Sequence, residues 1–476
     1  MDKITLGVII GNRDFFADEL CKEGRKRLMP VLEENGINPI VLDEDEGVYG
    51  SVQNRDDARK CAALLRKHSD EIKGIIVTLP NFGDEKSIVE TIKMSGLDVP
   101  VLVHAFSDDI EKLDYIHRRD SFCGKISVCN NLRQYGINYT LTSSHTINPD
   151  MEQFQDDLNK FIGVCNVFDK IKGARIGLIG ARPADFNTVR FSEKILQHNG
   201  ISVEPIGLLD LMNKLQFLED SDQKVKEGLK EIESYMNTDS VPGDSLVKMA
   251  KLLLVYRDWV VDNEIDAVAF QCWDSLQGAL GINPCTVMSI LSNEGVPSAC
   301  ESDVMGALSM YALQAASKLP SGIVDWNNNY QNDPDKAVIF HCGNFARDIY
   351  SCSGNECPKV NYPEILGSTL GQENTYGAIE GRIKADEISF ARVSTDDTTG
   401  KIQVYLAEGE ITEKSLDTFG SWGVARVAGL QKLMNYICSN GFEHHVAINL
   451  SSVADILEEA FNNYLGWDVY NHKGDN

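Results

Sequence analysis

The hydrophobic positions of the first 120 residues fall into short continuous runs, separated by stretches of helical periodicity. The runs ITLGVII, INPIVLD, GIIVTLP and VPVLVHAF are expected as strands. The stretches between them, such as ADELCKEGRKRLMPVLEENG, place their charges on one face, as amphipathic helices do. Continuous β-branched runs such as GIIVTLP are typical of buried parallel strands. Regular alternation of strand and helix predicts a parallel sheet covered by helices on both faces.

A helical stretch over residues 151–171 leads to a second pattern of the same kind. Residues 173–183, GARIGLIGARP, are expected as a strand that runs into a turn. Their glycines have G-x-x-G spacing, which differs from the G-x-G-x-x-G of a dinucleotide site. Further strands are expected at ISVEPIGL, IDAVAFQCW, VPSACESD and KAVIFHCGNF.

After about residue 351 the periodicity changes to short alternating runs, which include TYGAIEGRI, EISFARVST and KIQVYLAEGE. Turn residues separate these runs, as antiparallel strands require. A helix over residues 424–439, the strand HHVAIN and the helix VADILEEAFNNYLG close the chain. We therefore expect an α/β protein with two doubly wound parallel-sheet domains, residues 1–171 and 172–350. A C-terminal, mainly antiparallel and barrel-like β domain with closing helices is expected over residues 351–476.

The net charge of the chain excludes some classes of binding partner. The 476 residues include 45 basic and 71 acidic side chains, a net charge of −26. Binding to nucleic acid or to an anionic membrane surface needs a basic face, so neither is expected. No apolar stretch approaches the ~20 residues of a membrane helix. The N-terminus shows no signal-peptide pattern, and we expect a cytoplasmic protein.

The twelve cysteines are also consistent with a cytoplasmic protein. Many of them stand in apolar, strand-like contexts, which is typical of reduced thiols in a cytosolic core. Cys352 and Cys357 form a C-x4-C pair without a second pair nearby, so a structural zinc site is not indicated. We interpret these two as ordinary loop thiols.

Polar side chains that suit a metal follow several predicted strands. Gln271 and Trp273 follow AVAF, and Glu301, Asp325 and His341 follow other short apolar runs. His444 and His445 stand together late in the chain. Carboxylate oxygens and imidazole nitrogens together suit a hard or borderline divalent cation. Each side chain alone has an ordinary structural role, such as Asp303 capping the next helix. The metal interpretation depends on all of them together.

The chain resembles the L-fucose isomerase family, with L-arabinose isomerase as a more distant relative. The resemblance covers most of the chain and is carried by GNRDFF, DSFCGKISVCNNLRQ, GARPADFNTVR, QCW, CESDVMGA, VDW, HCGNF, EGRI and EHHVAI. In that family a Glu and an Asp that lie 24 positions apart bind the catalytic metal, and Glu301 and Asp325 have this separation. The family's third ligand is a late His, which His444 matches better than His445, although that choice stays open. His341 falls where the arabinose relatives carry a further His.

The resemblance implies a metal-dependent aldose–ketose isomerase that acts on a free sugar through an enediolate. Mn²⁺ is the expected metal, and Co²⁺ or Mg²⁺ suits the same ligands. Glu301 and Asp325 are expected to serve as ligands and as acid–base groups. Gln271 and Trp273 are the expected substrate contacts, and His341 is expected either to contact the substrate or to ligate the metal.

The family also implies a homo-oligomer, a trimer or a hexamer, with active sites shared between subunits. Arg13, in the loop after the first strand, is then expected to reach the substrate of a neighbouring subunit. If Arg13, Arg182 and Arg392 converge, the substrate is an anionic, sulfonated or phosphorylated sugar.

Other functions fit parts of this pattern. A metal-dependent sugar epimerase or lyase uses the same enediolate, and a ketose product of equal mass would separate an isomerase from either. A sugar-binding protein with two αβ domains performs no chemistry and needs no carboxylate pair. The sequence leaves the sugar and the metal open.

Overall fold

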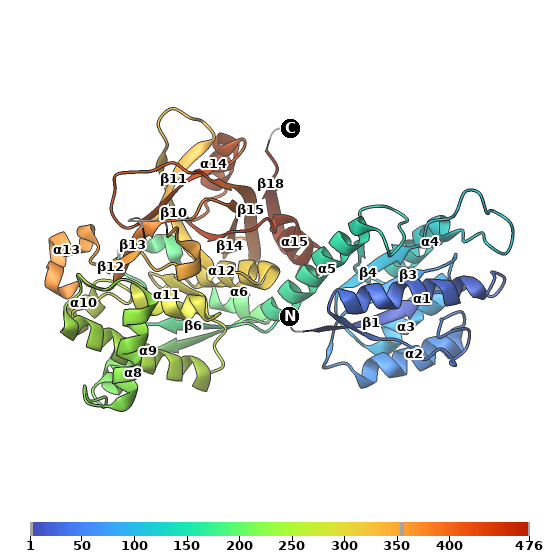
Figure 1. Cartoon of the computed structure of the whole chain (residues 1–476), viewed down its shortest axis with the longest axis horizontal. Helices are drawn as coiled ribbons and strands as arrows, with labels where there is room; N and C mark the ends of the chain where they lie inside the picture. The colour runs from blue at the N-terminus through green and yellow to red at the C-terminus, as the bar shows by residue number, and fades with distance from the viewer. Residues whose placement is uncertain (1–2, 353–356, 475–476) are drawn as a thin grey trace. The chain divides into compact units, whose positions relative to one another are not determined.

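The computed structural model describes residues 3–352 and 357–474, which divide into two units (Figure 1). The first unit comprises the chain up to Asp169 together with Glu459–Gly466. The second comprises Lys170–Glu458 and the residues from Trp467 onward. Within this described part of the chain, none of the helices combines the length and the hydropathy that a membrane span requires.

Five parallel strands form the sheet of the first unit, in the order β2-β1-β3-β4-β5. Successive side chains of a strand point to opposite faces, so the sheet has two apolar cores. Helices α2, α3 and α4 supply one core, and α1 and α5 supply the other. The elements are β1 (Ile4–Ile10), α1 (Glu19–Glu34), β2 (Ile37–Ile40), α2 (Arg55–Lys67), β3 (Ile72–Leu79), α3 (Glu85–Ser95), β4 (Val101–Ala105), α4 (Ser121–Gln134), β5 (Thr140–Leu141) and α5 (Glu152–Ile171).

The second unit contains a four-stranded parallel sheet in the order β7-β6-β8-β9. Its strands are β6 (Arg175–Ile179), β7 (Ser202–Ile206), β8 (Ala267–Phe270) and β9 (Ser298–Cys300). The helices of this part are α6 (Glu193–His198), α7 (Leu208–Leu215), α8 (Gln223–Tyr235), α9 (Gly243–Asp262), α10 (Ser275–Leu280), α11 (Cys285–Asn293) and α12 (Val304–Ser317).

A mainly antiparallel sheet of nine strands follows, in the order β12-β13-β16-β11-β10-β17-β14-β15-β18. A further pairing between β15 and β16 closes the six strands from β16 to β15 into a barrel. The strands are β10 (Ser321–Asn329), β11 (Lys336–His341), β12 (Lys359–Asn361), β13 (Ala378–Arg382), β14 (Glu387–Asp396), β15 (Lys401–Ile411), β16 (Ser421–Arg426), β17 (His445–Asn449) and β18 (Asp468–His472). Helices α13 (Glu364–Leu370), α14 (Leu430–Ser439) and α15 (Ala454–Glu458) connect them, and a π-helix at Glu459–Tyr464 continues α15.

The expected fold class is confirmed by these two parallel α/β sheets and the barrel. Strands β10 and β11 precede residue 351 in the sequence, yet they pair within the barrel sheet. The boundaries expected for three domains stay a prediction.

Two local expectations are wrong. The helix expected over residues 424–439 begins only at Leu430. Val424 and Ala425 instead belong to β16, where they are buried and pair with β11. Gly429 has a left-handed conformation and separates this strand from the helix. The second correction concerns Cys352 and Cys357, which are joined in a disulfide.

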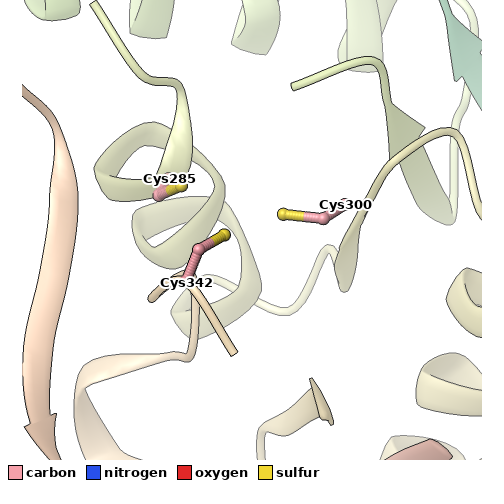
Figure 2. A group of neighbouring side chains, drawn as sticks. All are labelled: Cys285, Cys300 and Cys342. Carbon is pink, nitrogen blue, oxygen red and sulfur yellow. The ribbon is translucent and has the colours of Figure 1, made fainter. Parts of the chain in front are cut away.

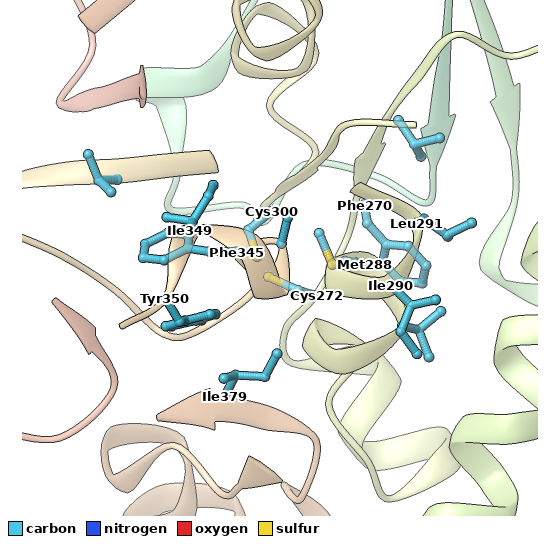
Figure 3. Close-up of a cluster of buried hydrophobic side chains, with 14 of the residues drawn as sticks. Phe270, Cys272, Met288, Ile290, Leu291, Cys300, Phe345, Ile349, Tyr350 and Ile379 are labelled. Atoms are coloured by element: carbon cyan, nitrogen blue, oxygen red, sulfur yellow. The ribbon is translucent and has the colours of Figure 1, made fainter. Parts of the chain in front are cut away.

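One apolar core joins the parallel sheet of the second unit to the barrel. Phe270 and Met288 come from the α/β part, and Phe345, Tyr350 and Ile379 come from segments associated with the barrel (Figure 3). Helix α12 lies against strands of both sheets, and its first ten residues are all buried. This shared core holds the ends of β8 and β9 in place relative to β10, β11 and β17.

Candidate functional site: a carboxylate and imidazole centre

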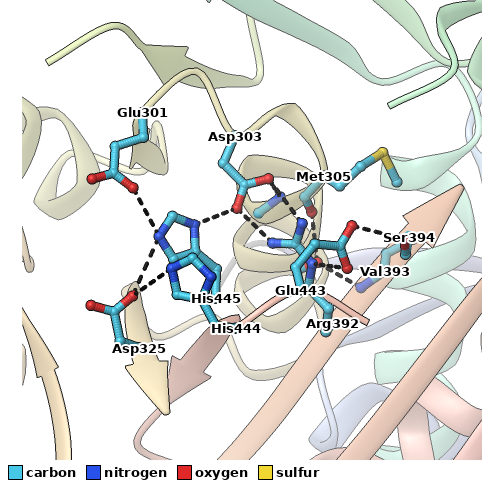
Figure 4. A network of polar contacts seen from close by, with 12 residues as sticks. Glu301, Asp303, Met305, Asp325, Arg392, Val393, Ser394, Glu443, His444 and His445 are labelled. Atoms are coloured by element: carbon cyan, nitrogen blue, oxygen red, sulfur yellow. Dashed lines mark hydrogen bonds and ion pairs between the residues drawn. The ribbon is translucent and has the colours of Figure 1, made fainter. Parts of the chain in front are cut away.

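The polar residues that follow separate strands meet at one place in the second unit (Figure 4). Glu301 follows β9, at the carboxyl edge of the parallel sheet. Asp325 lies in β10 directly opposite His445, the first residue of β17. On its other side β10 pairs with β11, which ends at His341. The antiparallel register therefore brings Asp325 next to His445 although 120 residues separate them in the sequence.

At the centre of this cluster, a buried imidazole nitrogen lies near two buried carboxylate oxygens. Nε2 of His445 lies 3.0 Å from Oε2 of Glu301 and 3.4 Å from Oδ1 of Asp325 (Figure 4). None of the three atoms makes a hydrogen bond within the described chain. Buried polar atoms without hydrogen-bond partners are costly. In this cluster, the side chains that could hold a divalent cation form two groups, whose ligand atoms lie within 4.8 Å of one another: Glu301 with His341 and His445, and Asp325 with His444 and His445. Two carboxylate oxygens and an imidazole nitrogen are the donor set that such a cation prefers.

The other histidines border the same centre. His341 is 2% exposed, and one of its ring nitrogens lies within 4.8 Å of ligand atoms of Glu301 and His445. Nε2 of His444 lies 3.4 Å from Oδ1 of Asp325, but the His444 side chain is 42% exposed. His341 and His445 are thus enclosed, whereas His444 is open to solvent.

Asp303 orients the His445 ring. The Nδ1–H of His445 donates a hydrogen bond of 2.8 Å to Oδ2 of Asp303, because a carboxylate only accepts. This bond turns Nε2 toward Glu301 and Asp325, as in the carboxylate–histidine pairs that support metal ligands. Burial acts to lower the pKa of His445, but the Asp303 and Glu301 carboxylates outweigh it and raise the pKa to about 10. The carboxylates therefore stabilise positive charge at this position.

Asp303 is held in turn by a buried ion-pair network. Two guanidinium nitrogens of Arg392 donate to the two oxygens of Asp303 at 2.6 and 3.0 Å. The Nε of Arg392 donates to Glu443 at 3.1 Å, and Arg392 is completely buried. Burial favours the neutral form of Asp303, yet Arg392 and His445 hold the pKa of Asp303 well below its usual range. Asp303 also accepts a bond from the Gly306 amide, so the expected helix cap is confirmed.

Trp273 and Gln271 lie at the end of β8, beside this centre. The indole N–H of Trp273 donates to Oε1 of Glu301 at 2.8 Å, which leaves Oε2 facing the histidine. The side-chain carbonyl of Gln271 accepts from the Ala181 amide at 2.8 Å and thereby holds the loop that follows β6. The side-chain oxygen of Gln271 is thus engaged in a hydrogen bond within the protein.

The loop after β6 places an aromatic ring over the histidines. The Phe186 ring centroid lies 5.4 Å from that of His444, 5.6 Å from that of His445 and 6.0 Å from that of Trp273. Phe186 lies within the motif GARPADFNTVR, and this motif is the sequence feature that could have identified Phe186 as a site residue. Sequence reasoning did not assign Phe186, Arg190 or Glu443 to the site, and it gave Asp303 only the role of a helix cap.

A cavity of about 740 Å³ borders the site. Its lining includes Ser302, which follows Glu301, and Glu443, which precedes His444. Arg182 and Arg190, from the two ends of the Phe186 loop, also line it. Arg392 does not join them, because it is buried between Asp303 and Glu443.

Arg13 lies in the first unit, at the end of β1. Its Nε donates to the Gly83 carbonyl at 2.8 Å, and its guanidinium also pairs with Glu85. The guanidinium lies 4.3 Å from the centroid of the Phe82 ring. The role of Arg13 at a neighbouring subunit stays a prediction.

Comparison with known proteins identifies the family. The model of the fucose/sulfoquinovose isomerase N-terminal domain matches residues 7–172, and that of the L-fucose isomerase C-terminal domain matches residues 339–473. The chain belongs to the L-fucose isomerase family. It is an aldose–ketose isomerase of carbohydrate metabolism, which confirms the function expected from the sequence.

Several curated relatives are named sulfoquinovose isomerase. The protein of Alkalicoccus urumqiensis is 25% identical over 66% of this chain and 68% of its own length. That of Priestia aryabhattai is 22% identical over 72% of this chain and 74% of its own. That of Clostridium sp. (strain MSTE9) is 27% identical over 71% of this chain and 74% of its own.

Proposed function

We propose that this isomerase depends on a divalent metal held by Glu301, Asp325 and His445. The observation that carries the proposal is the position of the buried Nε2 of His445, which lies 3.0 Å from Oε2 of Glu301 and 3.4 Å from Oδ1 of Asp325. The Asp303 bond supports His445 as the imidazole ligand in place of His444. His444 is half-exposed and touches only Asp325 of the two carboxylates, so we assign it to the substrate side. Mn²⁺ is the expected cation, and Co²⁺ or Mg²⁺ suits the same donors.

When bound, the cation would polarise the sugar oxygens at C1 and C2. The protein must still move one proton between the two carbons and another between the two oxygens. We assign the carbon-bound proton to Glu301, because Trp273 fixes its other oxygen and leaves Oε2 directed into the site. Asp325 then transfers the proton between the two sugar oxygens. The rings of Phe186 and Trp273 limit the access of water, which keeps the carbon-bound proton within the site.

The experiment compares metal content and ketose formation in three proteins: the wild type, Glu301→Gln and Glu373→Gln. Glu373 lies in a short 3-10 segment outside the site, so its variant controls for the amide substitution. Wild type and Glu373→Gln should form ketose with Mn²⁺ and lose this activity after chelation. Glu301→Gln should lose on the order of 10²–10⁴ in kcat. Full activity of thoroughly chelated wild type would refute the metal dependence.

For the substrate we propose an aldohexose that carries a sulfonate. The relatives named sulfoquinovose isomerase support this choice, as does the position of two arginines beside the site. Arg182 and Arg190 stand on the loop that also carries Phe186, and arginine binds an anionic oxygen group well. The test measures kcat/KM for sulfoquinovose beside glucose and L-fucose. A higher value for a neutral sugar would instead favour the unsubstituted sugar as substrate.

We also propose that the chain acts in the cytoplasm as a trimer or hexamer with active sites shared between subunits. The family supports the oligomer, and the ten free cysteines of the described chain support a reducing compartment. Sedimentation of the purified protein tests the assembly. Mixing Arg13→Ala with Glu301→Gln subunits tests shared sites, since only shared sites would recover activity in the mixture.

A further inference from the structure

Three cysteines lie together on the apolar side of the catalytic segments. The sulfurs of Cys285, Cys300 and Cys342 all lie within 4.8 Å of one another. Figure 2 shows the three side chains pointing toward a common centre from α11, from the end of β9 and from the residue after β11. A fourth cysteine, Cys272 after β8, lies near Cys300 but outside this group of three (Figure 3).

The surroundings of this thiol cluster are apolar. Cys272, Cys285 and Cys300 are each 3% exposed or less. Phe345, Tyr350 and Ile379 pack around Cys272 and Cys300 (Figure 3). A single buried thiol behaves as a small hydrophobic group, and packing alone explains it. Packing does not require three sulfurs from three separate segments to converge, whereas a thiophilic cation does.

We propose that Cys285, Cys300 and Cys342 form a second metal site, which binds a thiophilic cation of the Zn²⁺ class through three thiolates. Zinc–sulfur bonds of about 2.3 Å in a tetrahedron place the sulfurs about 3.8 Å apart, which the observed separations allow. Binding breaks the S–H bonds of the ligands, forms metal–sulfur bonds and releases the protons to solvent. Thiolate ligands distinguish this site from the carboxylate and imidazole centre, which prefers harder cations.

The position of the thiol cluster indicates its role. Cys300 directly precedes Glu301, and Cys342 directly follows His341. The sulfur of Cys342 also lies 3.4 Å from Nδ1 of His341. A cation bound by the sulfurs of Cys285, Cys300 and Cys342 would therefore cross-link helix α11 to the segments that carry Glu301 and His341. This structural site would hold the catalytic side chains in place without contacting the substrate.

The test titrates reduced, Mn²⁺-loaded, full-length protein with Cd²⁺ and records the ultraviolet charge-transfer absorption of cadmium thiolates. The wild type should bind one Cd²⁺ per chain with this absorption, and Glu301→Gln should do the same. The variant Cys285→Ser/Cys300→Ser should lose the absorption. The matched control is Cys123→Ser/Cys438→Ser, which removes two exposed thiols and should retain it. Absence of the absorption from fully reduced wild type would overturn the proposal, as would an equal signal in the Cys285→Ser/Cys300→Ser protein.

A second measurement needs no substitution and so does not depend on the folding of a variant. Zinc-edge X-ray absorption of wild type, loaded with one equivalent of Zn²⁺ after Mn²⁺, should show three sulfur ligands at about 2.3 Å. A spectrum with only nitrogen and oxygen ligands would overturn the proposal. The readout is independent of sugar turnover, so its failure is distinguishable from a failure of the proposed isomerase mechanism.

Discussion

The Nδ1–H of His445 donates to Oδ2 of Asp303 over 2.8 Å, and this bond decides which nitrogen of the ring faces Glu301. Asp303 itself does not reach the centre, because its two oxygens are engaged by Arg392, His445 and the first turn of α12. It therefore acts on the reaction through His445, as a positioning residue.

The first prediction concerns this bond. Asp303→Asn should lower Mn²⁺ affinity about 10–100-fold, since an amide cannot hold the imidazole tautomer as the carboxylate does. Calorimetric titration of Mn²⁺ measures the loss, and thermal unfolding confirms that the variant is folded. Asp258→Asn, on an exposed position of α9, is the matched control and should bind Mn²⁺ as the wild type does. Unchanged affinity in folded Asp303→Asn would show that the bond has no effect on the metal.

The second prediction separates the adjacent histidines. His445→Gln should lower Mn²⁺ affinity by at least about 100-fold, because it removes the nitrogen that faces both carboxylates. His444→Gln should retain the metal and raise KM, since His444 is assigned to the substrate side. Metal content after dialysis and initial rates distinguish the two. The opposite result would assign the metal to His444.

The third prediction concerns the buried arginine. Arg392→Met leaves the Asp303 and Glu443 carboxylates buried without a counter-charge, which should lower the free energy of unfolding by about 3–5 kcal/mol. Arg426→Met removes an exposed pair with Glu410 and should cost about 0–1 kcal/mol. Urea unfolding of both variants at pH 7 measures the difference. Equal midpoints would mean that the buried network contributes no more than a surface pair.

The fourth prediction is a pH dependence in the first unit. Burial lowers the pKa of His104 to about 3. The Nε2–H of the neutral ring donates to the Ile147 carbonyl, and Nδ1 accepts from the Thr78 hydroxyl. In the unfolded chain a histidine has a pKa of about 6.5, so the unfolded state binds the extra proton first. Stability is therefore fully present above pH 6.5 and is lost as the pH falls toward 3, by about 1.4 kcal/mol per pH unit.

Urea midpoints at pH 7 and pH 5 test this slope. His104→Gln should show a shallower loss between the two pH values than the wild type. His198→Gln removes an exposed histidine and should keep the slope of the wild type. A slope unaltered by His104→Gln would assign the acid sensitivity to other groups.

Helices and strands could be predicted where the local hydrophobic pattern determines them. The run GIIVTLP is buried on both faces as β3, and residues 151–171 form the expected helix α5 to within one residue. The strand at residues 424–426 could not be predicted, because its pairing with β11 overrides a periodicity that suits a helix. The disulfide between Cys352 and Cys357 depends likewise on how the loop folds.

The sequence by itself determined the α/β and β architecture, because it depends on periodicity along the chain. The family and the isomerase activity followed from motifs that resemble known proteins, and the same resemblance led to the proposal of the carboxylate pair. Only the tertiary structure decided what surrounds that pair. His444 and His445 are adjacent in the sequence, but His444 lies in the bend before β17 and is exposed, whereas His445 is the first residue of the strand and is buried. The register of β10 with β17 places His445 against Asp325, and the packing of α12 between the sheets brings Asp303 and Arg392 to its other side. Contacts between segments so far apart along the chain produce no periodic pattern in the sequence. Strand pairing and packing alone determine them.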